Sequence, residues 1–85
     1  MAATAPVYNL AFPLTKSDSV DIEQFLPLGP TDAVYVGGAG IVVAVFPNGS
    51  TAQFTCVAGQ TLPIAVKRVN STSTTATLML ALYQR

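Results

Sequence analysis

The sequence predicts a small all-β domain, and three observations support this fold class. Two apolar runs, residues 41–46 and 51–57, are joined by Pro47-Asn48-Gly49-Ser50, a pattern typical of a β-hairpin in which Gly49 takes a positive φ. Val, Ile, Phe, Tyr and Thr, which fill a pleated surface well, recur in further short runs separated by turn residues. With 85 residues, the chain is long enough for one domain and one core.

The composition indicates that other protein covers part of the surface. Hydrophobic residues make up 51% of the chain and charged residues only 9%. Soluble domains typically carry roughly 25% charged residues. An isolated copy would therefore expose much uncharged surface, which lowers solubility. We expect copies of this chain, or another protein, to cover that surface.

The charges argue against nucleic acid and membrane as partners. Four basic residues balance four acidic ones, and only Lys67 and Arg68 are adjacent. Binding to nucleic acid needs several phosphates to be neutralised, so it is not expected. No apolar run approaches the roughly 20 residues of a membrane span, and the N-terminus has no secretory signal pattern. We expect the chain to stay in a cytoplasm-like compartment until assembly.

The chain lacks the residues that an enzyme of the common types needs. Nucleophilic catalysis requires a base beside the nucleophile, and there is no His. Cys56 is the single Cys, so we expect no intrachain disulfide and no Cys-based metal site, but a small side chain packed in a strand. The carboxylates Asp18, Asp21 and Glu23 lack the EF-hand spacing and are expected on a solvated face. We predict no catalytic residue, no metal and no cofactor.

The segment of residues 1–17 is expected to be extended. Pro6 and Pro13 disfavour a helix, while the segment is too apolar for a disordered tail. Alternation places four large side chains on one side of the segment: Tyr8, Leu10, Phe12 and Leu14. Two alternatives stay open: an edge strand of the domain itself, or an arm laid across a neighbouring subunit.

Two alternatives also stay open for residues 17–23. Ser17 or Asp18 could cap a short helix, or Val20 and Ile22 could face inward from a short strand. The strand is favoured slightly, because the prolines that follow leave little length for a helix.

Residues 24–32 carry Pro27, Gly29 and Pro30 and are predicted to be a loop. Its apolar side chains should pack beneath the loop or against a partner; they are Phe25, Leu26 and Leu28.

The central strands follow from the alternation of side chains. A strand is expected from residue 33 to 36, and the Gly-rich residues 37–40 give room for a tight turn or bulge but have no phosphate-loop context. Residues 41–46 are apolar on both faces, as in the middle of a sandwich or at a subunit contact. In residues 51–57, Phe54 and Cys56 should face the core, and the Thr and Gln side chains should face solvent.

Two further strands complete the prediction. Residues 62–69 alternate, with Leu62, Ile64 and Val66 inward and Lys67 outward, and Pro63 places the start at an edge or a bulge. Residues 70–73 turn the chain again. In residues 74–83 we expect the core face to consist of Ala76, Leu78, Leu80 and Leu82.

Several of these segments resemble a known family. The stretches are AVYVGGAGIVV at residues 33–43, VAGQTLPIAVKRVN at 57–70, and TTAT at 74–77 leading to ALY at 81–83. KSDSVDI at residues 16–22 resembles the segment before the tyrosine strand of that family. Together they resemble small phage-type virion proteins, typified by the head-spike base of gene transfer agents. The resemblance covers about residues 16–83 and includes no catalytic motif.

The resemblance implies a small antiparallel β-sandwich or jelly-roll-like domain. We place this domain at residues 18–85 and expect an extended N-terminal arm at residues 1–17, where the sequence departs from the family. It implies a structural virion protein on the outer surface of a tailed-phage-type icosahedral head, made in the cytoplasm of a bacterial host. Such a protein acts as head decoration, as cement or as a spike base. Its expected partners are copies of itself in a symmetric ring, the major capsid protein, and a head fibre or spike protein. The residues expected at these contacts are Tyr8, Leu10, Phe12, Leu14, Phe25 and Leu26.

The alternative function is a glycan-binding β-module for host attachment. Such modules usually present Trp or several exposed Tyr side chains on which sugars stack. This chain has no Trp, and its Tyr residues are scattered at Tyr8, Tyr35 and Tyr83. We therefore rank glycan binding below the structural role as the expected function.

Overall fold

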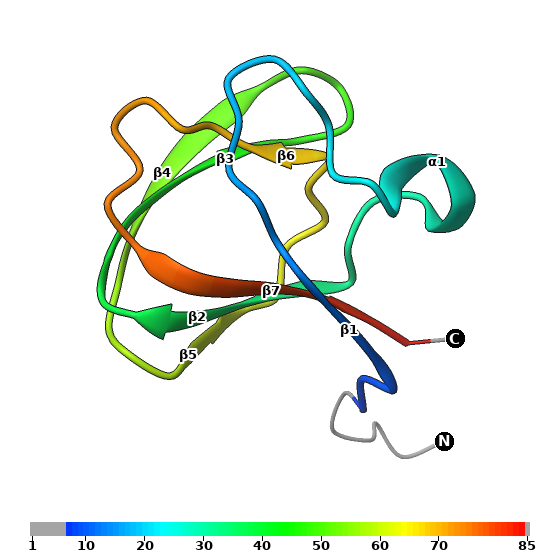
Figure 1. Cartoon of the computed structure of the whole chain (residues 1–85), viewed down its shortest axis with the longest axis horizontal. Helices are drawn as coiled ribbons and strands as arrows, with labels where there is room; N and C mark the ends of the chain where they lie inside the picture. Colours follow the sequence, from blue (N-terminus) through cyan, green and yellow to red (C-terminus); the bar gives the residue numbers. More distant parts are fainter. Residues whose placement is uncertain (1–6, 85) are drawn as a thin grey trace.

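The computed structural model describes residues 7–84, which form two antiparallel β-sheets (Figure 1). The four-stranded sheet has the order β1-β7-β2-β5, and the three-stranded sheet has the order β4-β3-β6. The elements are β1 (Leu10–Pro13), α1 (Phe25–Leu28), β2 (Ala33–Gly38), β3 (Gly40–Val45), β4 (Thr51–Cys56), β5 (Gln60–Leu62), β6 (Arg68–Val69) and β7 (Thr77–Tyr83). The prediction of a small all-β domain is confirmed.

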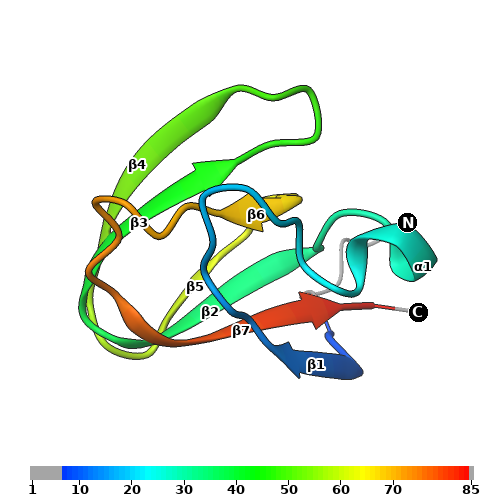
Figure 2. The same cartoon turned by 45° about the horizontal axis from the view of Figure 1, so that its top comes forward.

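The chain passes from the first sheet to the second at the Gly-rich segment, at one end of the sandwich (Figure 2). β2 ends at Gly38 and β3 begins at Gly40, which has φ 155°. A Cβ on Gly40 would lie 2.6 Å from the backbone N of Ala76 and 2.7 Å from the carbonyl carbon of Thr75. Glycine is therefore required here, because the segment before β7 runs against the backbone of the crossing.

The hairpin of β3 and β4 has the predicted form. Phe46 N donates to Ser50 O at 2.8 Å, and Gly49 takes φ 89° in the turn. In β4, Cys56 is buried and Phe54 is half-buried against the core, whereas the alternate residues are exposed, as expected.

The doubly apolar strand β3 lies in the middle of its sheet. Val42 and Ala44 belong to the core. Val43 and Val45, on the other face, are also buried, with 8% and 2% of their surface exposed. The strand is thus covered within the chain, so its two apolar faces do not require a neighbouring subunit.

Part of the segment predicted as an arm is an edge strand of the domain. β1 pairs with β7 in antiparallel register, Leu10 opposite Tyr83 and Pro13 opposite Leu80. Of the two alternatives, an edge strand of the domain or an arm across a neighbouring subunit, the edge strand is therefore correct for Leu10–Pro13. Residues 1–6 of the predicted arm lie outside the described residues, and the boundary at residue 17 stays a prediction.

The slight preference for a strand around Val20 and Ile22 was wrong. Residues 18–24 form neither helix nor strand. Ser17 Oγ accepts from Val20 N at 3.1 Å, and this local bond competes with a sheet ladder. Ile22 is 7% exposed and packs in the core, whereas Val20 is 66% exposed.

The predicted loop of residues 24–32 contains one helical turn, α1. Pro27 is compatible with it, because the N–H groups of the first turn have no partner within the helix. Gly29 ends the turn at φ 82°, and its N–H donates to Phe25 O. The predicted loop was therefore wrong for Phe25–Leu28.

The predicted continuous strand of residues 62–69 was wrong, because the chain changes sheets there, but Leu62, Ile64 and Val66 do face the core as predicted. β5 ends at Leu62 and β6 begins at Arg68, in the opposite sheet. Pro63 follows β5 and has no N–H for a ladder. Thr31 holds this crossing: its Oγ1 donates to Ile64 O at 2.9 Å and accepts from Val66 N at 3.1 Å.

Thr31→Val should destabilise the fold. Thr31 is 1% exposed, and the substitution would leave the buried Val66 N–H without its acceptor. Such a loss costs about 1–3 kcal/mol, and each kcal/mol lowers the melting temperature by about 4–8 °C in a domain of this size. Thr61→Val, at an exposed position of β5, is the control for thermal unfolding. Equal melting temperatures for the two variants would contradict the role of Thr31.

The direction in which β7 faces was predicted incorrectly. Its core residues are Met79, Ala81 and Tyr83, while Leu78 is 77% exposed. Leu78 has φ 55°, and it lies between the buried Ala76 and the buried Met79. This left-handed residue shifts the alternation by one position. Both faces of the segment are apolar in sequence, so alternation could not select the correct one.

Candidate interaction surface

The outward side of the four-stranded sheet is an uncharged surface. The three Leu side chains of β7 at positions 78, 80 and 82 alternate with its core residues and so point away from the core. Their cross-strand neighbours continue the surface. We define the outer apolar face as Ala11, Pro13, Tyr35, Leu78, Leu80 and Leu82. The four strands of this sheet contain no Asp, Glu, Lys or Arg.

The register shows that five of these residues are direct neighbours, and Leu78 continues the surface along β7. Pro13 and Tyr35 both lie opposite Leu80, one on each side of β7, and Ala11 lies opposite Leu82. Ala11 and Pro13 are exposed, and Leu80 and Leu82 are half-buried. Scattered exposed apolar residues are ordinary, but a continuous uncharged strip across several strands is typical of a protein contact.

Leu78 is the most costly residue of the outer apolar face. A left-handed backbone at a non-Gly residue is unfavourable by about 1 kcal/mol or more, and Leu78 also leaves 77% of its surface in water. Neither the left-handed backbone nor the exposed side chain of Leu78 helps to pack the core. An uncommon backbone conformation of this kind often marks a functional position, so Leu78 is our leading candidate for a contact residue.

The predicted contact residues of the N-terminal segment face the domain itself. Leu14 is a core residue with 8% of its surface exposed, and Leu10 and Phe12 pack against the same core. The Phe12 and Tyr83 rings pack in a T-shaped arrangement, with centroids 6.0 Å apart. Tyr8 is half-buried. These side chains therefore offer a partner little surface, and their predicted contact role stays a prediction.

The two predicted contact residues on α1 differ from each other. Phe25 packs against the core, whereas Leu26 is 91% exposed. The structure thus separates Leu26 from the other five predicted residues. It also adds Leu78, which sequence reasoning had assigned to the core. The sequence signal that could have identified this contact surface is the complete absence of charge from both faces of residues 77–83.

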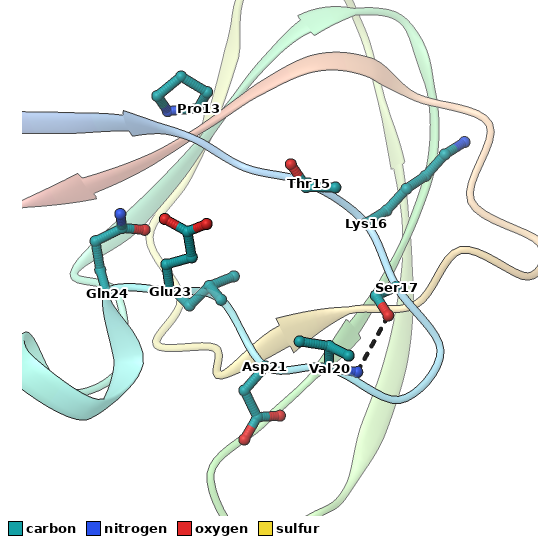
Figure 3. A pocket seen from close by; sticks show the side chains of 9 residues that line it. Pro13, Thr15, Lys16, Ser17, Val20, Asp21, Glu23 and Gln24 are labelled. Atoms are coloured by element: carbon teal, nitrogen blue, oxygen red, sulfur yellow. Dashed lines mark hydrogen bonds between the residues drawn. The ribbon is translucent and has the colours of Figure 1, made fainter.

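A cavity of about 560 Å³, with both polar and apolar lining, lies between the end of β1 and the segment before α1 (Figure 3). In the close view, the Lys16 and Asp21 side chains point away from it, and Glu23 points into it. Lys16 Nζ donates to Thr74 O at 3.0 Å, and Asp21 pairs with Arg68 at 2.9 Å. The lining includes no aromatic ring. Among residues 7–84, no group of His, Cys, Asp and Glu could hold a metal ion.

Two of the carboxylates predicted to lie on a solvated face make specific contacts. Asp21 forms the ion pair with Arg68, and Asp18 accepts from Thr72 Oγ1 at 2.6 Å and from Thr72 N at 2.8 Å. The hydrogen bond from the Thr72 hydroxyl has the largest effect on the pKa of Asp18, and the bond from Thr72 N the next; both lower it. Burial raises the pKa of the Cys56 thiol, which keeps it neutral and unreactive.

The contribution of Asp18 to stability should disappear in acid. Because its pKa is lower in the folded chain, the stabilisation is complete above the unfolded pKa and is lost as the pH falls through the folded value. Asp18→Ala should therefore melt below the wild type at neutral pH, by a small margin because the group is exposed, and the two should converge in acid. Thr72→Val, which removes the hydroxyl donor, should behave similarly. A gap that persists unchanged at strongly acid pH would contradict this assignment.

No helix in the part of the chain that the structure describes is long and apolar enough to span a membrane. No family model matches the chain, and no curated protein does. A solved structure does match, under the description "Capsid of native GTA particle computed with C5 symmetry", where GTA denotes a gene transfer agent. The likeness has a TM-score of 0.78 and 29% sequence identity, and it covers 94% of this chain and 90% of that chain.

Proposed function

We propose that this chain is a structural virion protein on the outside of a tailed-phage-type head, serving as head decoration, cement or spike base. The observation that carries the proposal is the nearly full-length likeness, at 29% identity, to a chain in the capsid of a GTA particle. That chain and this one correspond over almost their whole lengths, so the likeness covers the complete domain. The protein acts by binding to copies of itself and to capsid protein, without catalysis.

The outer apolar face supports this role physically. Burying apolar surface contributes roughly 25 cal/mol per Å², and the uncharged sheet requires no ion to be desolvated. Weak contacts of this kind become effective in a particle, because copies held on one lattice engage their partners together. Leu26, exposed on α1, extends the apolar surface available for contact.

The structure offers little support for the glycan-binding alternative. Tyr83 is fully buried and donates its hydroxyl to Gly29 O at 3.0 Å, so no sugar can stack on it. The cavity between β1 and α1 has no aromatic lining. No observation on the described residues favours this alternative, and we do not carry it as a second proposal.

The proposal is tested by adding the purified chain to heads assembled without it. We expect the chain to sediment with the heads and to appear as extra density on their outer surface in electron microscopy. Density at the vertices alone indicates a spike base, and density across all facets indicates cement. Failure to bind heads would contradict the proposal, and binding on a glycan array would then favour the alternative function.

A further inference from the structure

The open edge of β4 differs from the other sheet edges. A sheet edge exposes unpaired N–H and C=O groups, and proteins usually protect it with short strands, Pro or charge. β5 and β6 have only 3 and 2 residues, and β1 ends in Pro13. β4 has 6 residues, pairs with β3 on one side, and lies at the end of its sheet. Its strand residues include no Pro and no charged side chain.

The bonds of β3 show which of its residues turn away from β4. Ile41 O accepts from Thr75 N, Val43 O accepts from Asn70 N, and Val45 O accepts from Lys67 N, each at 2.9 Å. These odd-numbered residues of β3 therefore bond toward the β6 side. Because the bonding direction alternates along a strand, Val42 and Ala44 bond toward β4.

The register then fixes the bonding of β4. Val42 lies opposite Phe54 and Ala44 opposite Ala52, so Phe54 and Ala52 make the ladder bonds to β3. The alternate residues of β4 direct their N–H and C=O groups at the open edge. They are Thr51, Gln53 and Thr55, whose side chains are also exposed.

Charge is absent far beyond this strand. Residues 33–66, which include β2 to β5, contain no Asp, Glu, Lys or Arg. The open edge of β4 therefore produces no electrostatic repulsion against a second uncharged strand, including an identical copy of itself. A charged peptide would gain no ion pair here, so an uncharged strand is the matching partner.

We propose that β4 pairs with β4 of a second copy, in antiparallel orientation about a two-fold axis at Gln53. β4 is the longest exposed edge among the described residues, and an identical strand pairs with it from Thr51 to Thr55. Thr51 of one copy then lies opposite Thr55 of the other, and the two Gln53 residues lie opposite each other. On the inner side, Phe54 of one copy lies opposite Ala52 of the other, so a large side chain meets a small one.

This contact is independent of the proposed virion function. It is isologous, since the same strand serves on both copies, whereas a ring is built from head-to-tail contacts. It also uses an edge of the three-stranded sheet and leaves the outer apolar face free. Failure of the wild-type chain to bind heads, with its dimer intact, would therefore overturn the virion proposal and leave this one standing.

Gln53→Pro tests the pairing directly. Pro removes the N–H that points to the open edge and leaves the ladder to β3, a placement that edge strands tolerate. We expect the wild type to have twice the chain mass of 8.8 kDa in light scattering, and the variant to have one chain mass with an unchanged circular dichroism spectrum. Should Gln53→Pro fail to fold, Gln53→Lys brings two positive charges together at the axis and should give the same loss of mass. Gln53→Asn is the uncharged control and should remain a dimer.

Cross-linking tests the register, in a Cys56→Ala background. Gln53→Cys lies opposite itself at the axis, so a short bis-maleimide should join the two copies. Thr51→Cys is the control, since the two copies of residue 51 would be roughly 14 Å apart along the strands. A monomeric wild type, an unchanged mass of Gln53→Lys, or equal cross-linking of the two Cys variants would overturn the proposal.

Discussion

Gly40→Ala should lower the unfolding free energy by about 2–6 kcal/mol, since a strained backbone and overpacking each cost about 1–3 kcal/mol. At φ 155° the position disfavours any side chain. The new Cβ would also lie 2.6 Å from the backbone N of Ala76, which cannot move without displacing the start of β7. Total stability is commonly about 5–15 kcal/mol and is expected at the low end for a short chain. The variant should therefore be largely unfolded near body temperature.

Gly49→Ala is the matched control for this substitution. Gly49 also has a positive φ, 89°, but a Cβ there would meet no atom within 4 Å. It therefore measures the backbone strain alone, and the difference between the two variants in urea unfolding measures the steric conflict at the crossing. Equal losses of stability would show that the contact with Ala76 relaxes freely.

Leu78→Lys should abolish binding to heads while leaving the domain folded. The side chain is 77% exposed, so the fold does not depend on it. In a contact, the charge would be buried against an uncharged sheet without a partner. Loss of a hot-spot contact residue costs about 2 kcal/mol or more, which weakens each contact roughly 30-fold. Co-sedimentation with heads measures the loss.

Two further variants make this test specific. Val20→Lys adds the same charge at a similarly exposed apolar residue, 66% exposed and outside the outer apolar face, and should bind normally. Leu78→Asn removes the apolar contact but suits a left-handed backbone, so it should melt at or above the wild-type temperature and still fail to bind. Normal binding by Leu78→Asn would remove Leu78 from the contact surface.

The sequence was most informative where a local signal and the alternation agreed. The Pro-Asn-Gly-Ser turn and the residues on either side of it predicted the hairpin and the core face of β4, because only one face of β4 is apolar. Where both faces are apolar, as in residues 77–83, the choice depended on the backbone of a single residue, Leu78, which no pattern shows.

The other errors arose from tertiary contacts. Alternation continues through residues 62–69 although the chain changes sheets, and the side chain that holds the crossing, Thr31, is distant in sequence. The contact residues were predicted from apolarity alone, which cannot distinguish a core position such as Leu14 from an exposed one such as Leu26. The open edge of β4 could be identified only once the order of the strands was known.

The pairing of β1 with β7 has a consequence for the time at which the molecule becomes able to assemble. These are the first and last strands of the described chain, and they lie side by side in one sheet. Pairing between such distant segments is slow, because a long loop must close first. The outer apolar face takes residues from both strands, so it cannot form until β7 has been made. A nascent chain therefore lacks this surface, and folding precedes the contacts that the outer apolar face makes.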